Sequence, residues 1–452
     1  MPFLLFDHIS KRAPHLLRCF YYMKTQKHIY IYEYLCNNTY YNKNGVIGMK
    51  NALFEQLENL FPEMVKARRH LHMYPELSFK EQFTPEYVRQ HLESLGIECR
   101  THVGGNGVVG TLHGGKPGPT VALRADFDAL PIQDEKDVPY KSTIDGVSHA
   151  CGHDVHTAAL MAVETVLAGV KEELAGTVVF IHQFAEELPP GGAQLMIADG
   201  CLEGVDYIYG AHVWADDDYG TIGFIPGPAM AGGDNFEITI QGKGGHGAIP
   251  HTTVDPLVTM SQLVVNLQQI VSRKMDPNTA NVVTIGKFHS GEATNVIPDT
   301  ATISGTTRTF DAESKDVMEQ WIRMMSESTA AQNGAAAKVD FTYGCVPLIN
   351  SEAETEQLKV LTEQHLPDMT VEEKTPMMTS EDFAYYLEHV PGSFFFVGAG
   401  NPEIDAVHPH HHPKFDVDER AMIEIGKVFI LAVLHHMDGL EVADCETAEA
   451  SK

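Results

Sequence analysis

The sequence predicts an α/β protein in which a smaller domain interrupts a larger one. Two apolar runs, residues 120–126 and 177–184, have the composition of strands buried on both faces, and a helical pattern lies between them. From residue 236 onward, strands and amphipathic helices follow in the order βαββαβ, which is the order of the ferredoxin-like fold. We therefore assign residues 49–231 and 345–440 to the larger domain and residues 232–344 to the inserted one.

The larger domain is predicted from apolar periodicity and from turn residues. The predicted helices cover residues 53–70, 85–95, 155–170, 352–365, 380–388 and 419–436, and the predicted strands cover 108–112, 120–126, 177–184, 207–211 and 393–397. The run Gly105–Gly110 matches the dinucleotide fingerprint GxGxxG. That motif requires a helix after its glycines, whereas a strand and a Gly/Pro turn follow here, so we reject a nucleotide site.

In the inserted domain, Phe236, Ile238 and Ile240 alternate with polar residues, as in a half-buried strand. An amphipathic helix over 257–271, strands over 281–288 and 301–310, a helix over 314–333 and a strand over 337–344 complete the pattern. We expect an antiparallel sheet with both helices on one face.

Composition excludes several partners. The chain has 32 basic and 61 acidic residues, a formal charge of −29, which repels nucleic-acid phosphates and anionic membrane surfaces. Its longest apolar stretches are shorter than the roughly 18 residues of a membrane span. The seven cysteines form no disulfide-like spacing, so we expect a reducing, cytoplasmic location.

The two ends of the chain differ from the rest. Residues 1–48 are rich in tyrosine and asparagine and lack a clear helical or strand pattern, and Met49 begins a more regular sequence. We expect this extension to be non-native or dispensable, with a short strand over 28–35 as the alternative. Residues 2–6 are too short for a signal-peptide core. Residues 441–452 are expected to be a solvated acidic tail.

The run from Ser148 to His156 combines a thiol, three imidazoles and a carboxylate. Gly152 separates Cys151 from His153 and lets the backbone turn tightly around a small object. Short Cys/His tracts are also common in loops without a ligand. A metal ion is the interpretation that the downstream residues favour.

Further ligand-type side chains follow the predicted strands, at the edge where open α/β sheets bind ligands. They are Glu187, His212 and one of His408, His410, His411 or His412. Together with Cys151 and His153 they exceed one closed tetrahedral site, so we predict two adjacent cations that share a ligand. Glu186 directly precedes Glu187 and points in a different direction, which suits a general acid/base beside a metal-activated water.

Six segments resemble the M20 metallopeptidase family, and in particular its aminoacylase branch, which includes hippurate hydrolases, auxin-conjugate amidohydrolases and N-acetyl-diaminopimelate deacetylases. The segments are 124–132, 149–154, 185–187, 244–251, 294–298 and 411–415, in the order that the family shows. The resemblance extends from about residue 53 to residue 436. Phe184 replaces a common proline, and His410 replaces a common apolar residue.

The resemblance implies a zinc-peptidase-like catalytic domain with a lid that also forms a dimer. It implies that Cys151 bridges two divalent cations, that His153, Glu187, His212 and His411 complete the ligand set, and that Glu186 is the general acid/base. His410 is the alternative to His411. Zinc or manganese is expected, and cobalt or nickel also suits these ligands.

For the lid, the resemblance implies that His246 stabilises the oxyanion, often in the partner's site, and that Asn295 and Arg308 bind the substrate carboxylate. The structural alternatives are a hairpin turn for His246, a turn for Asn295 and an inter-strand salt bridge for Arg308. We predict a homodimer or higher homo-oligomer.

We predict an amidohydrolase that cleaves the amide bond of small N-acyl amino acids. A dipeptidase or carboxypeptidase with the same metal pair is the alternative among enzymes. A binding protein that retains the scaffold is the alternative from another class, and Glu186 argues against it because a binder needs no base.

Overall fold

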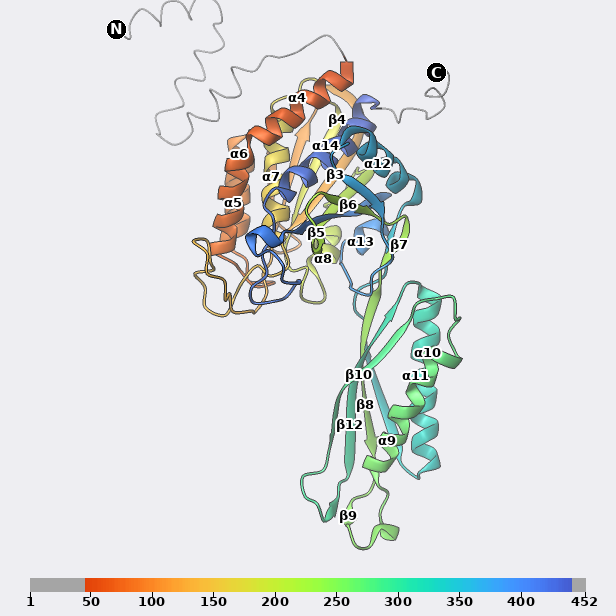
Figure 1. Cartoon of the computed structure of the whole chain (residues 1–452). Coiled ribbons are helices and arrows are strands. Elements are labelled where there is room, and N and C mark those ends of the chain that lie inside the picture. The colour runs from red at the N-terminus through yellow and green to blue at the C-terminus, as the bar shows by residue number, and fades with distance from the viewer. Residues whose placement is uncertain (1–44, 441–452) are drawn as a thin grey trace, which may run out of the picture. The chain divides into compact units, whose positions relative to one another are not determined.

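The computed structural model describes residues 45–440 (Figure 1). The chain divides into two compact units, residues 1–52 and 53–452. In the first unit the described residues are helical and begin α4 (Gly45–Asn59), so residues 45–48, which we placed in the extension, belong to a helix. The rest of the predicted extension and the predicted acidic tail lie outside the described residues.

The predicted helix over 53–70 is wrong as a single element. The structure has α4 and α5 (Phe61–Met73), with a break at Leu60. Pro62 lies in the first turn of α5. Proline is tolerated there but lacks an N–H and clashes with the preceding turn of a continuous helix, so it ends one helix and begins the next.

The larger sheet is mixed and has eight strands in the order β1-β2-β4-β3-β5-β16-β6-β15. Its strands are β1 (Glu98–Val103), β2 (Gly107–His113), β3 (Lys116–Asp126), β4 (Ala175–Gln183), β5 (Tyr207–Asp218), β6 (Thr221–Phe224), β15 (Thr370–Glu373) and β16 (Gly392–Gly400). The central strands β4, β3, β5 and β16 run parallel to one another, whereas β2 and β6 pair antiparallel with β4 and β16. The predicted α/β class is confirmed. Strand β2 begins within Gly105–Gly110 and leads to β3, so the helix that a dinucleotide fingerprint requires does not follow these glycines.

Several helices pack against the larger sheet or against one another. Helices α7 and α14 contact β3 and each other, α5 packs on α7, and α12 packs on α14. The bounds of the helices in this unit are α6 (Phe83–Ser94), α7 (His153–Ala168), α8 (Gly192–Ala198), α12 (Glu352–His365), α13 (Ala384–Leu387) and α14 (Ala421–Asp438). Within residues 45–440, no helix is both long enough and apolar enough to cross a membrane.

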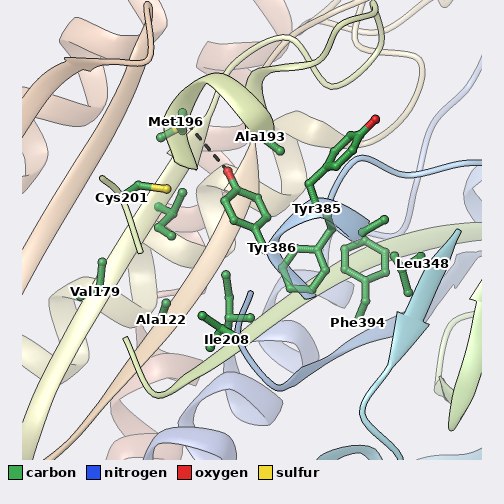
Figure 2. Close-up of a cluster of buried hydrophobic side chains, with 14 of the residues drawn as sticks. Ala122, Val179, Ala193, Met196, Cys201, Ile208, Leu348, Tyr385, Tyr386 and Phe394 are labelled. Carbon is green, nitrogen blue, oxygen red and sulfur yellow. Dashed lines mark hydrogen bonds between the residues drawn. The ribbon is translucent and has the colours of Figure 1, made fainter. Parts of the chain in front are cut away.

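The short helices α8 and α13 cover an apolar cluster on the larger sheet (Figure 2). The sequence did not predict α8. Val179 of β4, Ile208 of β5 and Phe394 of β16 contribute to this cluster, together with Met196 of α8. Tyr386 of α13 is fully buried there, and its hydroxyl lies 3.9 Å from the Met196 sulfur. This packing fixes the segment that precedes α13, and that segment borders the functional site.

The smaller sheet has four antiparallel strands in the order β10-β12-β8-β13. Its elements are β8 (Gly232–Gln241), α9 (Pro256–Leu267), α10 (Gln269–Arg273), β10 (Val282–Ser290), β12 (Thr300–Thr309), α11 (Ala312–Gln332) and β13 (Ala336–Thr342). The three helices lie on the same face of this sheet (Figure 1). The predicted βαββαβ order is confirmed, whereas the proposed domain boundaries stay a prediction.

Two short ribbons and two short 3-10 helices complete the described chain. The ribbon strands are β7 (Gly227–Met230) with β14 (Leu348–Asn350), and β9 (Gly245–His246) with β11 (Val296–Ile297). The 3-10 helices are η1 (Pro250–Thr252) and η2 (Pro402–Ile404).

Candidate metal centre and catalytic site

The parallel strands bring the predicted ligands to one edge of the larger sheet. Asp126 ends β3 opposite Gln183, which ends β4 and leads to Glu186 and Glu187. Arg124 of β3 pairs with Gly210 of β5, so that β5 carries His212 to the same level as Asp126. The sheet register thus gathers residues that are far apart in the sequence.

The turn from Cys151 to His153 depends on Gly152. Gly152 has a φ of 102° and precedes the first residue of α7, and a Cβ atom on it would lie 2.3 Å from Val213 Cγ2. Only glycine suits both this backbone conformation and the close approach of β5. The thiol of Cys151 consequently lies 3.4 Å from His212 Nε2.

Both buried imidazoles have one nitrogen fixed by a backbone carbonyl. His153 Nδ1 donates to the Asp128 carbonyl at 2.9 Å, and His212 Nδ1 donates to the Val213 carbonyl at 2.6 Å. With Nδ1 as the donor, each Nε2 can serve as a metal donor atom once it carries no proton, as in metal-binding histidines. His153 Nε2 is buried without a hydrogen-bond partner among the described residues.

Glu187 lies between His153 and His411. Its Oε1 is 3.9 Å from His153 Nε2 and 3.4 Å from His411 Nε2, and it is itself buried without a hydrogen-bond partner in the described chain. The backbone N–H of His411 donates to the Ala150 carbonyl at 2.7 Å, which places this histidine beside the Cys151 turn.

The structure brings His411, not His410, into this group. His410 Nε2 already accepts a hydrogen bond from the Ala215 N–H at 3.1 Å, and its ring packs on Trp214. The residues alone left these neighbours open, because both are imidazoles in one irregular segment, and the family resemblance favoured His411.

Two groups of donor atoms share Cys151. One contains Cys151, His153 and His212, and the other contains Cys151, Glu187 and His411. Within each group the donor atoms lie within 4.8 Å of one another. A thiol, three imidazoles and a carboxylate, with two of their buried donor atoms unpartnered, are a donor set that fits divalent cations. These five residues therefore fit the predicted pair of divalent cations.

The charges around His153 also attract a cation. Burial lowers the pKa of His153, but the negative charges of Asp126, Asp128 and Glu187 outweigh it and raise this pKa to about 10. For the Cys151 thiol, burial and the carboxylates of Glu187 and Glu186 raise the pKa. Neighbouring carboxylates contribute to both shifts, and a bound cation would neutralise this negative charge.

Glu186 belongs to two groups of nearby donor atoms, one with His153 and Glu187 and the other with Glu381 and Asp382. Its carboxylate lies within 4.8 Å of carboxylate oxygens of Glu381 and Asp382. Burial, followed by the charges of Glu381 and Glu187, raises the pKa of Glu186 well above its ordinary value. A carboxyl group in this environment holds a proton more readily than an exposed one.

Sequence reasoning missed the network that supports these acids. Arg124 is fully buried and donates from Nη1 to Asp126 at 2.7 Å and from Nη2 to Glu381 at 3.0 Å and Asp382 at 3.1 Å. Burial raises the pKa of Glu381 to about 8 and that of Asp382 to about 6. The available signal was a second pair of adjacent acids directly before the buried aromatic run that begins at Phe383.

A cavity of about 640 Å³ adjoins these groups. Its wall includes Cys151, Glu186, His411 and Arg308, and apolar side chains such as Trp214 and Tyr385. This volume is within the range of small-molecule sites.

The structure does not bring all the predicted lid residues to this cavity. Arg308 lines it and donates from Nη1 to the Thr307 carbonyl at 2.8 Å. His246 is exposed on β9, and the Asn295 carbonyl accepts the Gly247 N–H at 2.8 Å. Neither His246 nor Asn295 is among the residues that line the cavity of the described chain.

The sequence profile of Peptidase family M20/M25/M40 matches residues 122–435. The chain belongs to this family. Its M20 relatives include a Bacillus subtilis protein that bears the name of an amidohydrolase, YhaA, with 49% identity over 87% of this chain and 99% of that protein. The N-acetyl-L-cysteine deacetylase of the same organism is 42% identical over 81% of this chain and 86% of that protein.

A solved M20 structure has a similar fold. It is a Bacillus subtilis protein described as a dinuclear metal-binding peptidase, with a TM-score of 0.73 and 34% identity, and the match covers 84% of this chain and 99% of that chain. The predicted resemblance to the M20 family is confirmed.

Proposed function

We propose that this M20 protein is a metal-dependent amidohydrolase that cleaves the amide bond of N-acyl amino acids. The observation that carries the proposal is that only one of two adjacent glutamates lies in the donor group of Cys151 and His411. Glu187 lies within 4.8 Å of Cys151 and His411, whereas Glu186 lies in the same cavity beside Glu381 and Asp382 and also within 4.8 Å of His153 and Glu187. One acid is thus available as a ligand and its neighbour is available for proton transfer. The names of the relatives support the same activity.

The proposed cation ligands are Cys151, His153, Glu187, His212 and His411, with Cys151 shared between two divalent ions. Zinc or manganese is proposed, and cobalt or nickel also suits these donors. When bound, such ions polarise the scissile carbonyl and lower the pKa of a water molecule toward neutrality.

Glu186 would accept a proton from the attacking water and deliver it to the departing amine nitrogen. Its raised pKa favours the second step, because the protonated carboxyl persists at a higher pH than that of an exposed glutamate. Burial of the surrounding acids keeps bulk water from competing for this proton.

The lid residues have proposed roles in substrate binding. Arg308 lines the cavity and would bind the substrate carboxylate through its guanidinium fork. Asn295 and His246 are absent from the cavity wall of the described chain, and we propose that a second copy supplies them, with His246 donating to the oxyanion. This proposal requires a homodimer, with residues 232–344 as the lid and dimerisation domain and with residues 49–231 and 345–440 as the catalytic domain.

The test is a hydrolysis screen on protein reconstituted with Zn²⁺ or Mn²⁺. N-acetyl, N-benzoyl and diaminopimelate-type substrates should be cleaved in preference to unmodified dipeptides. Preferential cleavage of dipeptides or of C-terminal residues would instead identify a dipeptidase or carboxypeptidase. Tight binding without turnover would identify a binding protein.

The described residues include the free cysteines Cys99, Cys151, Cys201 and Cys345, which support a reducing, cytoplasmic location. Fractionation of the source cells would check this proposal.

A further inference from the structure

Arg68 on α5 lies between the two chain segments that carry His153 and His411. Its side chain is fully buried. Nε donates to Asp154 Oδ2 at 2.8 Å, and Nη2 donates to Asp416 Oδ1 at 2.8 Å. Nη1 contacts Glu419 Oε1 at 3.3 Å. One guanidinium therefore joins acids from two distant parts of the chain.

Two of these acids, Asp154 and Asp416, are close in the chain to a proposed ligand. Asp154 directly follows His153 in the first turn of α7. Asp416 follows His411 in a segment without regular secondary structure. Such a segment has no backbone ladder to fix its side chains, so tertiary contacts must determine where His411 lies.

Neighbouring contacts strengthen the same connection. Lys136 Nζ donates to the Phe415 carbonyl at 2.8 Å, and Tyr140 donates its hydroxyl proton to Asp416 Oδ2 at 2.7 Å. His72 Nδ1 lies 2.7 Å from Asp154 Oδ2 on the other side. The charged residues form a continuous buried network from α7 to the His411 segment.

A contribution to folding stability does not by itself explain why these charged residues are buried together. The desolvation free energy of buried ions largely offsets their electrostatic attraction, and proteins with apolar residues of similar size in their place are often equally stable. The planar fork of arginine is suited to holding several carboxylates in fixed relative positions, which a flexible lysine ammonium does less well. The arrangement therefore has the properties of a positioning device.

We propose that Arg68 is a positioning residue of the metal centre, which holds the His153 and His411 segments at the separation that two cations require. This inference rests on the proposed function, because it presumes that His153 and His411 bind cations. Arg68 is neither one of the proposed ligands nor one of the residues that line the cavity of the described chain.

The test compares three full-length variants by Zn²⁺ titration against a competing chelator and by the visible absorption of the Co²⁺-loaded protein. Arg68→Lys retains the charge and loses the fork, and Asp416→Asn retains the shape and removes one carboxylate. Arg69→Met is the matched control, because Arg69 is on the same helix and bonds Glu419 without contacting Asp154 or Asp416.

We expect Arg68→Lys and Asp416→Asn to weaken Zn²⁺ affinity by about 10- to 100-fold and to alter the Co²⁺ spectrum, the usual cost of removing an outer contact of a metal site. Arg69→Met should change neither. Wild-type affinity and spectrum in the folded Lys and Asn variants would overturn the inference. Failure of both variants to fold, judged by circular dichroism, would also overturn it, since Arg68 would then serve folding itself.

The same titration separates this inference from the proposed function. Wild-type protein that takes up no Zn²⁺ would overturn both. Wild-type protein that binds two Zn²⁺ ions while the variants match it would overturn the role of Arg68 alone.

Discussion

Replacing Glu186 by glutamine should separate proton transfer from metal binding. The change keeps the size of the side chain and removes its negative charge and its basicity. General acid–base catalysis contributes about 10²- to 10⁴-fold. We therefore expect kcat/KM to fall by that factor, which is a loss of about 2.7 to 5.4 kcal/mol of transition-state stabilisation. Cation content should stay near normal, because Glu187 is unchanged.

The same substitution should stabilise the cation-free protein. A carboxylate oxygen of Glu186 lies within 4.8 Å of one on Glu381, and Coulomb's law gives about 3.5 kcal/mol of repulsion between two unit charges at 4.8 Å for an effective dielectric constant of about 20. The realised gain is smaller, because protonation already relieves part of this repulsion near neutral pH.

The pH dependence of this gain has a definite sign. The pKa of Glu186 is raised above its ordinary value of 4.5 in the folded protein, so the folded state binds this proton more tightly than the unfolded chain does. The wild-type protein consequently loses stability as the pH rises above about 4.5 toward the raised folded-state value. Glutamine does not titrate, so this loss should be absent from the variant.

The assays are kcat/KM on an N-acyl amino acid, metal analysis, and thermal unfolding of chelator-treated protein at pH 5 and pH 8. Glu363→Gln, on an exposed position of α12, is the control. Unchanged turnover in Glu186→Gln would refute the acid/base role. An equal pH dependence of unfolding in wild type and variant would refute the electrostatic reasoning.

Four further changes address the centre and the cavity. Cys151→Ala should reduce bound cation below two equivalents by metal analysis, and two full equivalents remaining would count against a shared thiolate. His411→Ala should weaken cation affinity whereas His410→Ala should not, since His410 Nε2 already accepts the Ala215 N–H; equal losses in a titration would contradict this assignment. Chelation should lower the melting temperature, because a cation at about 100 times its Kd stabilises the folded protein by about 2.7 kcal/mol. An unchanged melting temperature after chelation would contradict the presence of a bound ion. Arg308→Met should raise KM more than it lowers kcat, the signature of lost substrate binding, and a pure kcat effect would argue for another role.

The local parts of the fold and site could be predicted from the sequence. The βαββαβ order followed from alternating and helical periodicity, which depend on residues close together in the chain. The pairing of Cys151 with His153 followed from the intervening Gly152. The position of Glu186 and Glu187 at the ligand-binding edge followed from the apolar strand that precedes them.

Other features required the tertiary structure. The break between α4 and α5 at Leu60 was missed because the apolar positions on both sides of it keep a helical spacing, and Pro62 was given too little weight. The resemblance favoured His411 over His410, and the tertiary structure adds a physical reason, because His410 Nε2 accepts a hydrogen bond from Ala215 of a distant strand.

The sequence by itself determined which chemical groups this protein carries at its strand ends and the order in which they occur. Only the tertiary structure decided which of them meet, because Arg68 and Arg124 each join acids that are separated by hundreds of residues along the chain. Such contacts leave no periodic trace in the sequence, since their geometry is set by strand register and helix packing and not by spacing along the backbone.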